Sequence, residues 1–197
     1  MGDTRLTTCQ GQDIAPHLAA LARLRIRVFR DFPYLYDGDL AYESDYLRRY
    51  ADCPESLFVL AFDGDDLIGA ATGMPLVADV EAFRAPFERA GLEPATVFYY
   101  GESVLLPEYR GRGIGKAFMA ERERHAAREG FTIAAFCAVE RPDDHPRKPP
   151  GYVPLHGFWR ARGYERQPDL TTTFRWKDIG EPAETDKPMV FWLKPLA

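Results

Sequence analysis

A glycine-rich loop between a predicted strand and a predicted helix constrains the fold more than any other feature of the sequence. The segment reads LLPEYRGRGIGKAF from Leu105 to Phe118. Pro107 ends the hydrogen bonding of the strand, and the alternating glycines let the chain turn with several N–H groups on one side. The following helix presents its own unpaired N–H groups and the positive end of its dipole at the same place. We therefore expect an anion site, such as one for a pyrophosphate, where this helix begins.

Two common nucleotide-binding fingerprints do not fit this loop. A dinucleotide fingerprint reads G-x-G-x-x-G, whereas the spacing here is G-x-G-x-G with Arg110 in front. A P-loop needs Ser or Thr directly after its lysine, whereas Lys116 is followed by Ala117. A tight strand-to-helix turn, with glycines for packing and arginines for solubility, remains the alternative to an anion site.

Hydrophobic periodicity predicts an α/β chain in which a hairpin precedes a strand–helix–strand crossover. Such an order predicts a mixed sheet with helices on both faces. Because the 197 residues show no repeat, low-complexity run or linker, we expect one domain over residues 1–197. The predicted strands cover 4–9, 56–62, 67–76, 96–106, 131–139, 170–177 and 189–194, and the predicted helices cover 14–30, 40–51, 80–90, 114–129 and 154–162.

Composition narrows the possible partners and compartments. The net charge of -5 with mixed signs argues against nucleic acid, because phosphate binding needs a basic face. The three cysteines form neither a disulfide framework nor a CxxC motif, and the histidines lack metal-ligand spacing. No stretch approaches the length of a membrane span. We expect a cytoplasmic protein without a metal site or membrane insertion.

The glycine-rich loop resembles the acyl-CoA signature of the GNAT superfamily of N-acyltransferases, Arg/Gln-x-x-Gly-x-Gly/Ala. It stands here as Arg110-Gly111-Arg112-Gly113-Ile114-Gly115, and the order of elements over 4–194 and the segment Phe158–Tyr164 are also similar. The resemblance implies a mostly antiparallel sheet with a splayed parallel pair, 96–106 and 131–139. It also implies acetyl-CoA as cosubstrate, held between these strands and on the helix. The implied contacts are Val104, Leu105, Leu106, Arg110, Gly111, Arg112, Gly113, Ile114, Gly115, Lys116 and Phe158.

Acyl transfer to an amine needs a group that takes a proton, because an alkyl amine titrates near pH 10. Glu102 stands in an otherwise apolar strand and is our candidate base; an exposed or ion-paired structural glutamate is the alternative. In the family a Tyr often protonates the leaving thiolate, but Trp159 occupies that position here, and an indole cannot act as a normal acid. Tyr152 and Tyr164 are nearby candidates. The oxyanion of the tetrahedral intermediate would be held by a strand backbone N–H such as that of Leu105, and Ser103 either assists with its hydroxyl or is a buried structural serine.

The stretch 27–46, between the first two predicted helices and in the start of the second, mixes aromatic residues with acidic ones, Glu43 among them. This mixture suits an amine with an apolar body, although a helix pair with a solvated acidic rim, or aromatics in the core of the sheet, would give the same pattern. The candidate acceptor-binding residues are Phe32, Tyr34, Tyr36, Tyr99 and Tyr100.

The sequence thus predicts an N-acetyltransferase that moves an acetyl group from acetyl-CoA to a primary amine of a small molecule by direct attack in a ternary complex. Three alternatives remain open: acetylation of protein lysines or N-termini, a catalytically silent CoA-binding regulatory domain, and an unrelated anion-binding protein. The long aromatic strands near the C-terminus suggest a homodimer.

Overall fold

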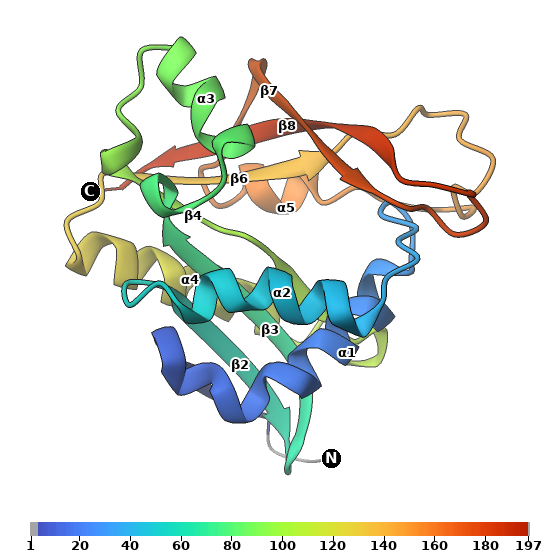
Figure 1. The fold of residues 1–197 in the computed structure, drawn as a ribbon, viewed down its shortest axis with the longest axis horizontal. Coiled ribbons are helices and arrows are strands. Elements are labelled where there is room, and N and C mark those ends of the chain that lie inside the picture. The colour runs from blue at the N-terminus through green and yellow to red at the C-terminus, as the bar shows by residue number, and fades with distance from the viewer. Residues whose placement is uncertain (1–3, 197) are drawn as a thin grey trace.

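The computed structural model describes residues 4–196, which form one eight-stranded sheet covered by helices (Figure 1). The sheet order is β1-β2-β3-β4-β6-β8-β7, and β5 pairs with β3 beside β4. The strands are β1 (Thr4–Cys9), β2 (Leu57–Asp63), β3 (Asp66–Pro75), β4 (Val97–Tyr99), β5 (Ser103–Leu105), β6 (Ile133–Val139), β7 (Glu165–Trp176) and β8 (Thr185–Pro195). The helices are α1 (Leu18–Phe29), α2 (Leu40–Ala51), α3 (Glu81–Arg89), α4 (Ile114–Arg128) and α5 (His156–Arg160).

The sheet is mixed, as the sequence predicted. Among the named strands that the structure describes, β4 and β6 pair in parallel and the other pairs are antiparallel. The helix α4 supplies the crossover from β5 to β6, which is the predicted strand–helix–strand unit.

Helices cover both faces of the sheet, and the side chains of β4 show which helix covers which face. Phe98 packs against His125 of α4, whereas its neighbour Tyr99 stacks on Phe83 of α3. The helices α1 and α2 lie on the α3 side, and α5 lies on the α4 side against β6 and β8 (Figure 1). The two faces therefore carry separate groups of functional side chains.

The predicted strand 96–106 is wrong as one continuous element, because an extra residue interrupts its pairing with β3. Met74 pairs with Tyr99 and Ala71 pairs with Ser103. Between these pairs β3 contributes residues 72 and 73, whereas the facing segment contributes residues 100, 101 and 102. This β-bulge separates β4 from β5 and changes the direction of the chain.

A buried arginine holds the bulge from the α4 side. The Arg122 side chain is almost fully buried, and its Nη1 donates to the carbonyl oxygens of Thr72 (3.2 Å) and Glu102 (3.0 Å). Its Nη2 donates to Ser103 Oγ at 2.7 Å, and its guanidinium lies over the ring of Tyr100. One side chain thus binds both strands at the point where their ladder is interrupted.

Other element boundaries differ from the prediction by a few residues for identifiable reasons. The predicted helix 14–30 begins as a 3₁₀ segment, Gly11–His17, which contains Pro16, and continues as α1. Proline removes a backbone donor and disfavours a regular α-helix interior. The strands β7 and β8 start earlier than predicted because their long antiparallel ladder extends through polar residues. Within residues 4–196, no helix combines the length and the apolar character that crossing a membrane requires.

We predict that Gly101→Ala destabilises the fold by about 1–3 kcal/mol, as overpacking of a filled core does. A Cβ at this position would lie 2.0 Å from Tyr50 Oη and 2.8 Å from Thr72 Oγ1. Urea denaturation gives the change in the free energy of unfolding. The matched control is Gly157→Ala in α5, where an added Cβ meets nothing within 4 Å. Equal stability of both variants would contradict the close packing at the bulge.

Candidate active site

The parallel pairing of β4 with β6 ends abruptly at the bulge. The last pair joins Tyr99 to Ala135, and the Tyr100 N–H donates to the Ala135 carbonyl oxygen at 2.8 Å. Beyond this point β5 pairs with β3, and β6 pairs with β8 on its other edge. The two strands therefore diverge and leave a gap in the sheet.

Backbone polar groups of both strands face this gap. The Leu106 N–H donates to the Ile68 carbonyl and the Thr72 N–H donates to the Glu102 carbonyl, so residues 102 and 106 bond towards β3. Since backbone direction alternates along a strand, the N–H and C=O groups of Ser103 and Leu105 point to the opposite edge. The same alternation holds along β6. Because the Ala135 carbonyl bonds to Tyr100, the backbone groups of Cys137 and Val139, two and four residues further on, also point towards the gap.

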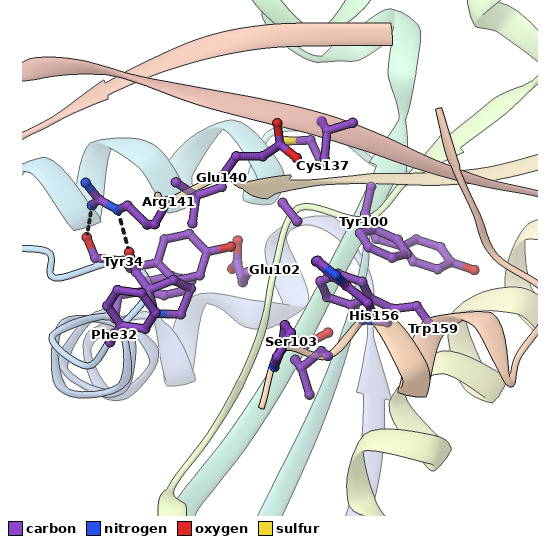
Figure 2. A pocket seen from close by; sticks show the side chains of 18 of the residues that line it. Phe32, Tyr34, Tyr100, Glu102, Ser103, Cys137, Glu140, Arg141, His156 and Trp159 are labelled. Atoms are coloured by element: carbon purple, nitrogen blue, oxygen red, sulfur yellow. Dashed lines mark hydrogen bonds between the residues drawn. The ribbon is translucent and has the colours of Figure 1, made fainter. Parts of the chain in front are cut away.

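A cavity of about 320 Å³, the first cavity, occupies the gap and continues under the loop after β6 (Figure 2). Figure 2 shows Phe32, Tyr34 and Arg141 on one side of it and Tyr100, His156 and Trp159 on the other, with Glu102 and Ser103 between them. Arg141 donates to the backbone oxygens of Pro33 and Tyr34, which ties the loop after β6 to the segment after α1.

The glycine-rich loop lies at the start of α4, as predicted. Gly111 and Gly113 adopt φ values of +78° and +86°, a region that L side chains avoid, and Gly113 caps the helix. The first N–H groups of α4 are those that a helix leaves without partners. Phe158 of α5 stands next to the loop, since a Cβ on Gly115 would lie 3.6 Å from its ring.

The charged side chains of the loop are exposed. Arg110 lies 3.9 Å from the Asp31 carboxylate, and Arg112 donates to the carbonyl oxygen of Glu108 at 2.7 Å. Lys116 is exposed on the first turn of α4. Three of the residues expected at the cosubstrate, Val104, Leu105 and Leu106, come from the end of the strand. Val104 and Leu106 are buried in the core and their backbone groups bond towards β3, so only Leu105 of these three turns its backbone to the gap.

Glu102 is buried on the bulge and forms an ion pair. Its Oε2 lies 2.5 Å from Arg25 Nη1 of α1, and Tyr46 donates to the same oxygen at 3.2 Å. Arg25 Nε in turn donates to Glu43 of α2. The ion-paired glutamate that the sequence left open is therefore present. Within residues 4–196, Oε1 of Glu102 has no hydrogen-bond partner, and the role of this carboxylate as a base stays a prediction.

The two candidate tyrosine acids occupy different places. Tyr152 lines the first cavity, with its ring edge-on to Phe32 at 4.7 Å, and partial burial raises its pKa. Tyr164 does not line the cavity: its ring packs on Phe136, and its hydroxyl donates to Glu123 at 2.9 Å. Burial also raises the pKa of Tyr164. The structure thus brings Tyr152, and not Tyr164, to the candidate site.

The five predicted acceptor-binding aromatics are divided between two cavities. Phe32 and Tyr100 line the first cavity, and Tyr36 and Tyr99 line a smaller one of about 80 Å³, the second cavity; Tyr34 lines both. The second cavity lies on the face of the sheet covered by α1, α2 and α3. The two cavities share the lining residues Phe29, Tyr34, Gly101, Glu102 and Cys137.

Three charged residues of this region were not singled out from the sequence: Arg25 and Arg122, and Glu43, which was counted only among the acidic residues of the stretch 27–46. All three are buried. A signal was available, because each occupies the apolar side of its helix. Arg25 follows Leu21 by four residues and Glu43 precedes Leu47 by four, which places each charge in line with core leucines.

Comparison with known proteins identifies the family. Residues 21–164 match the family model described as the acetyltransferase (GNAT) family. The chain belongs to the GNAT acetyltransferase family. The predicted family, mixed-sheet fold and enzyme class are thereby confirmed. A search of the curated proteins gave no match.

Solved structures of GNAT proteins share this fold at low sequence identity. A putative acetyltransferase from Acinetobacter baylyi ADP1 is 14% identical with a TM-score of 0.66, over 100% of this chain and 93% of that one. A ribosomal-protein-alanine N-acetyltransferase from Brucella melitensis is 16% identical with a TM-score of 0.61, over 96% and 99%. A phosphinothricin acetyltransferase from Sinorhizobium meliloti, in complex with AcCoA, is 16% identical with a TM-score of 0.60, over 98% and 89%. At these identities the likeness concerns the fold alone.

Proposed function

We propose that this GNAT acetyltransferase moves an acetyl group from acetyl-CoA to the primary amine of a small molecule by direct attack in a ternary complex. One observation carries the proposal. The first cavity, in the gap of the sheet, and the second cavity, on the α1–α2 face, meet at Glu102. A donor and an acceptor that enter from different sides would therefore come together at one carboxylate.

The residues around the gap fit acetyl-CoA. The outward backbone groups of Ser103, Leu105, Cys137 and Val139 offer donors and acceptors to the amides of a pantetheine arm. An added Cβ at Gly111 or Gly113 would meet nothing within 4 Å, so the loop leaves open space beside its N–H groups for a pyrophosphate. When bound, acetyl-CoA supplies an activated acetyl thioester.

Glu102 is placed to handle the proton of the amine. Its Oε2 is held by Arg25 and Tyr46, while Oε1 is left to accept a hydrogen bond from an ammonium group in the cavity. Transfer of one proton to this carboxylate yields the neutral amine that can attack a carbonyl carbon. The Leu105 N–H that faces the gap can donate to an oxygen that becomes negative during the transfer.

Two hydroxyl groups are available for the departing thiolate in place of the tyrosine that Trp159 replaces. Tyr152 reaches the first cavity from the loop after β6. Ser103 also lines it, and because its Oγ accepts a hydrogen bond from the Arg122 guanidinium, its own proton remains free to be donated. A nearby cation also makes a hydroxyl more acidic.

Cys137 is the cysteine that lines both cavities, and its surroundings favour direct transfer over an acetyl-cysteine relay. Burial raises the pKa of this thiol to about 12, and Tyr99 Oη lies 3.0 Å from its sulfur. The reactive form of a cysteine is the thiolate. A thiol that stays protonated at neutral pH is a poor nucleophile, so attack by the amine itself is the simpler route.

The small volume of the second cavity favours a small acceptor over a protein chain. A cavity of about 80 Å³ has room for a compact group and not for a length of protein chain. Homodimerisation stays a prediction as well. The strand β7 lies at one edge of the sheet, where a second chain could pair with it.

We predict that Gly113→Ala raises the Kd for acetyl-CoA about 10-fold or more, since one backbone contact to a charged phosphate contributes about 1.5–3 kcal/mol. The matched control is Gly130→Ala beyond the other end of α4. Gly130 has φ +85°, close to that of Gly113, and an added Cβ there also meets nothing within 4 Å. Both variants should lose similar stability, and calorimetry should show weakened binding for Gly113→Ala alone. Equal affinities would contradict a pyrophosphate site at this loop.

We predict that Glu102→Gln lowers kcat with small amines by about 100-fold or more, the usual contribution of a general base. The Kd for acetyl-CoA should stay close to that of the wild type. Transfer from labelled acetyl-CoA to a panel of amines measures turnover, and calorimetry measures binding. The exposed Glu88→Gln on α3 serves as the control. Unchanged turnover would remove Glu102 from the mechanism, and acetyl-CoA binding without transfer to any amine would favour a silent CoA-binding domain.

A further inference from the structure

The second cavity has a charged wall composed of one arginine and two glutamates. Arg25 of α1 lies between Glu43 of α2 and Glu102 of the bulge and contacts a carboxylate oxygen of each. The side chains of Arg25, Glu43 and Glu102 are 7%, 0% and 2% exposed. Two carboxylates facing one guanidinium leave this network with one excess negative charge.

Among the described residues, one carboxylate oxygen of each glutamate lacks a hydrogen-bond donor. Oε1 of Glu43 and Oε1 of Glu102 are buried and make no hydrogen bond with any of residues 4–196. Both glutamates line the second cavity. An isolated buried carboxylate oxygen is costly unless a donor satisfies it. The network therefore calls for a cationic hydrogen-bond donor in the cavity.

Most of the remaining lining is aromatic, and several of its rings are held in place by contacts with other side chains or the backbone. Phe83 stacks on Tyr99 and on Phe174, with ring centroids 5.1 and 5.4 Å apart. Trp176 Nε1 donates to the backbone oxygen of Tyr34 at 3.0 Å. Rings of Tyr36 and Tyr42 complete the lining beside Glu43. The faces of such rings attract a cation and give an apolar body a dry contact surface.

The volume limits the size of the occupant. One water needs about 10–15 Å³ of such space, so a cavity of about 80 Å³ holds a group of roughly half a dozen heavy atoms. A carboxylate on the occupant would lie among the buried glutamates, where like charges repel strongly at low dielectric.

We propose that the second cavity binds the acetyl acceptor as a compact monocationic amine without a carboxylate, with its ammonium group on Glu43 and Glu102 and its apolar body against the aromatic rings. The inference rests on the proposed function and specifies its substrate class. Glu43 acts in it as a binding residue, and Arg25 as the positioning residue that contacts both carboxylates and holds them at the cavity.

The experiment compares amines with the amino acids from which they differ by one carboxylate: isobutylamine with valine, and n-butylamine with norvaline. We expect kcat/KM to be at least 100-fold higher for each amine than for its amino acid. Glu43→Gln should raise KM for isobutylamine at least 10-fold, change kcat little and leave the Kd for acetyl-CoA unchanged. Glu88→Gln is the control and should behave as the wild type.

A second variant keeps the test valid if Glu43→Gln does not fold. Tyr42 lies on α2 and lines the second cavity, 36% exposed and outside the ion-pair network, and Tyr42→Leu should raise KM for both amines at least 3-fold. Calorimetric titration of wild-type protein with isobutylammonium, without acetyl-CoA, should detect binding that Glu43→Gln loses.

The possible failures are distinguishable. Equal kcat/KM for amine and amino acid, or an unchanged KM in Glu43→Gln and Tyr42→Leu, would overturn this inference and leave acetyl transfer to amines intact. Efficient transfer to valine or to a peptide amine, but not to isobutylamine, would also overturn this inference and leave acetyl transfer to amines intact. Binding of acetyl-CoA with no transfer to any amine would overturn the proposed function, and the inference with it.

Discussion

The active-site region depends on one buried guanidinium. Arg122 extends from α4 into the sheet and donates to the backbone oxygens of Thr72 and Glu102 and to the hydroxyl of Ser103. The carbonyl groups at a bulge have lost part of their ladder, and leaving them unsatisfied in the core would be costly. The Glu102 carbonyl keeps its bond from the Thr72 N–H and gains a second donor from Arg122, which also donates to the Thr72 carbonyl, at the expense of a desolvated charge whose pKa is lowered by burial. Without this contact, the separation of β5 from β6 would lack its support.

The bulge has two consequences that together create the site. It directs β5 away from β6, which opens the gap and exposes backbone groups of both strands to the first cavity. It also places Glu102 between the first and second cavities. A one-residue change of register inverts the direction of every following side chain, so a regular ladder here would direct these residues differently. The irregularity of the sheet is therefore the source of the geometry on which the proposed function rests.

The buried charges around Glu102 are better explained by ligand binding than by a contribution to the stability of the fold. A buried ion pair rarely adds net stability, because removing the charges from water costs about as much as their attraction returns. A network with one guanidinium and two carboxylates is less favourable still, since one negative charge remains uncompensated. Strained or unsatisfied groups of this kind concentrate at binding sites, where a ligand supplies the missing partner. The aromatic lining of the second cavity fits this role, because the faces of its rings attract a cation.

Much of the fold was predictable from local patterns. The predicted helix 40–51 matches α2 in its bounds, and the first predicted strand matches β1. The strand–helix unit around the glycine-rich loop was also located, because apolar periodicity, proline and glycine act over a few residues. The resemblance of the loop to the acyl-CoA signature was sufficient to identify the family. The bulge was not predictable, since the segment 96–106 reads as one apolar strand and its extra residue becomes visible only against β3.

The sequence by itself therefore determined the order of the elements, the class of fold and the position of the glycine-rich loop. The tertiary structure decided which side chains meet. Arg25, Glu43 and Glu102 come from α1, α2 and the bulge, and their contact depends on helix packing and sheet register that no local pattern specifies. It also separated Tyr152 from Tyr164, which are twelve residues apart but differ in access to the cavity. Local propensity acts between neighbours in the chain, whereas a catalytic arrangement is a property of distant segments brought together by the core.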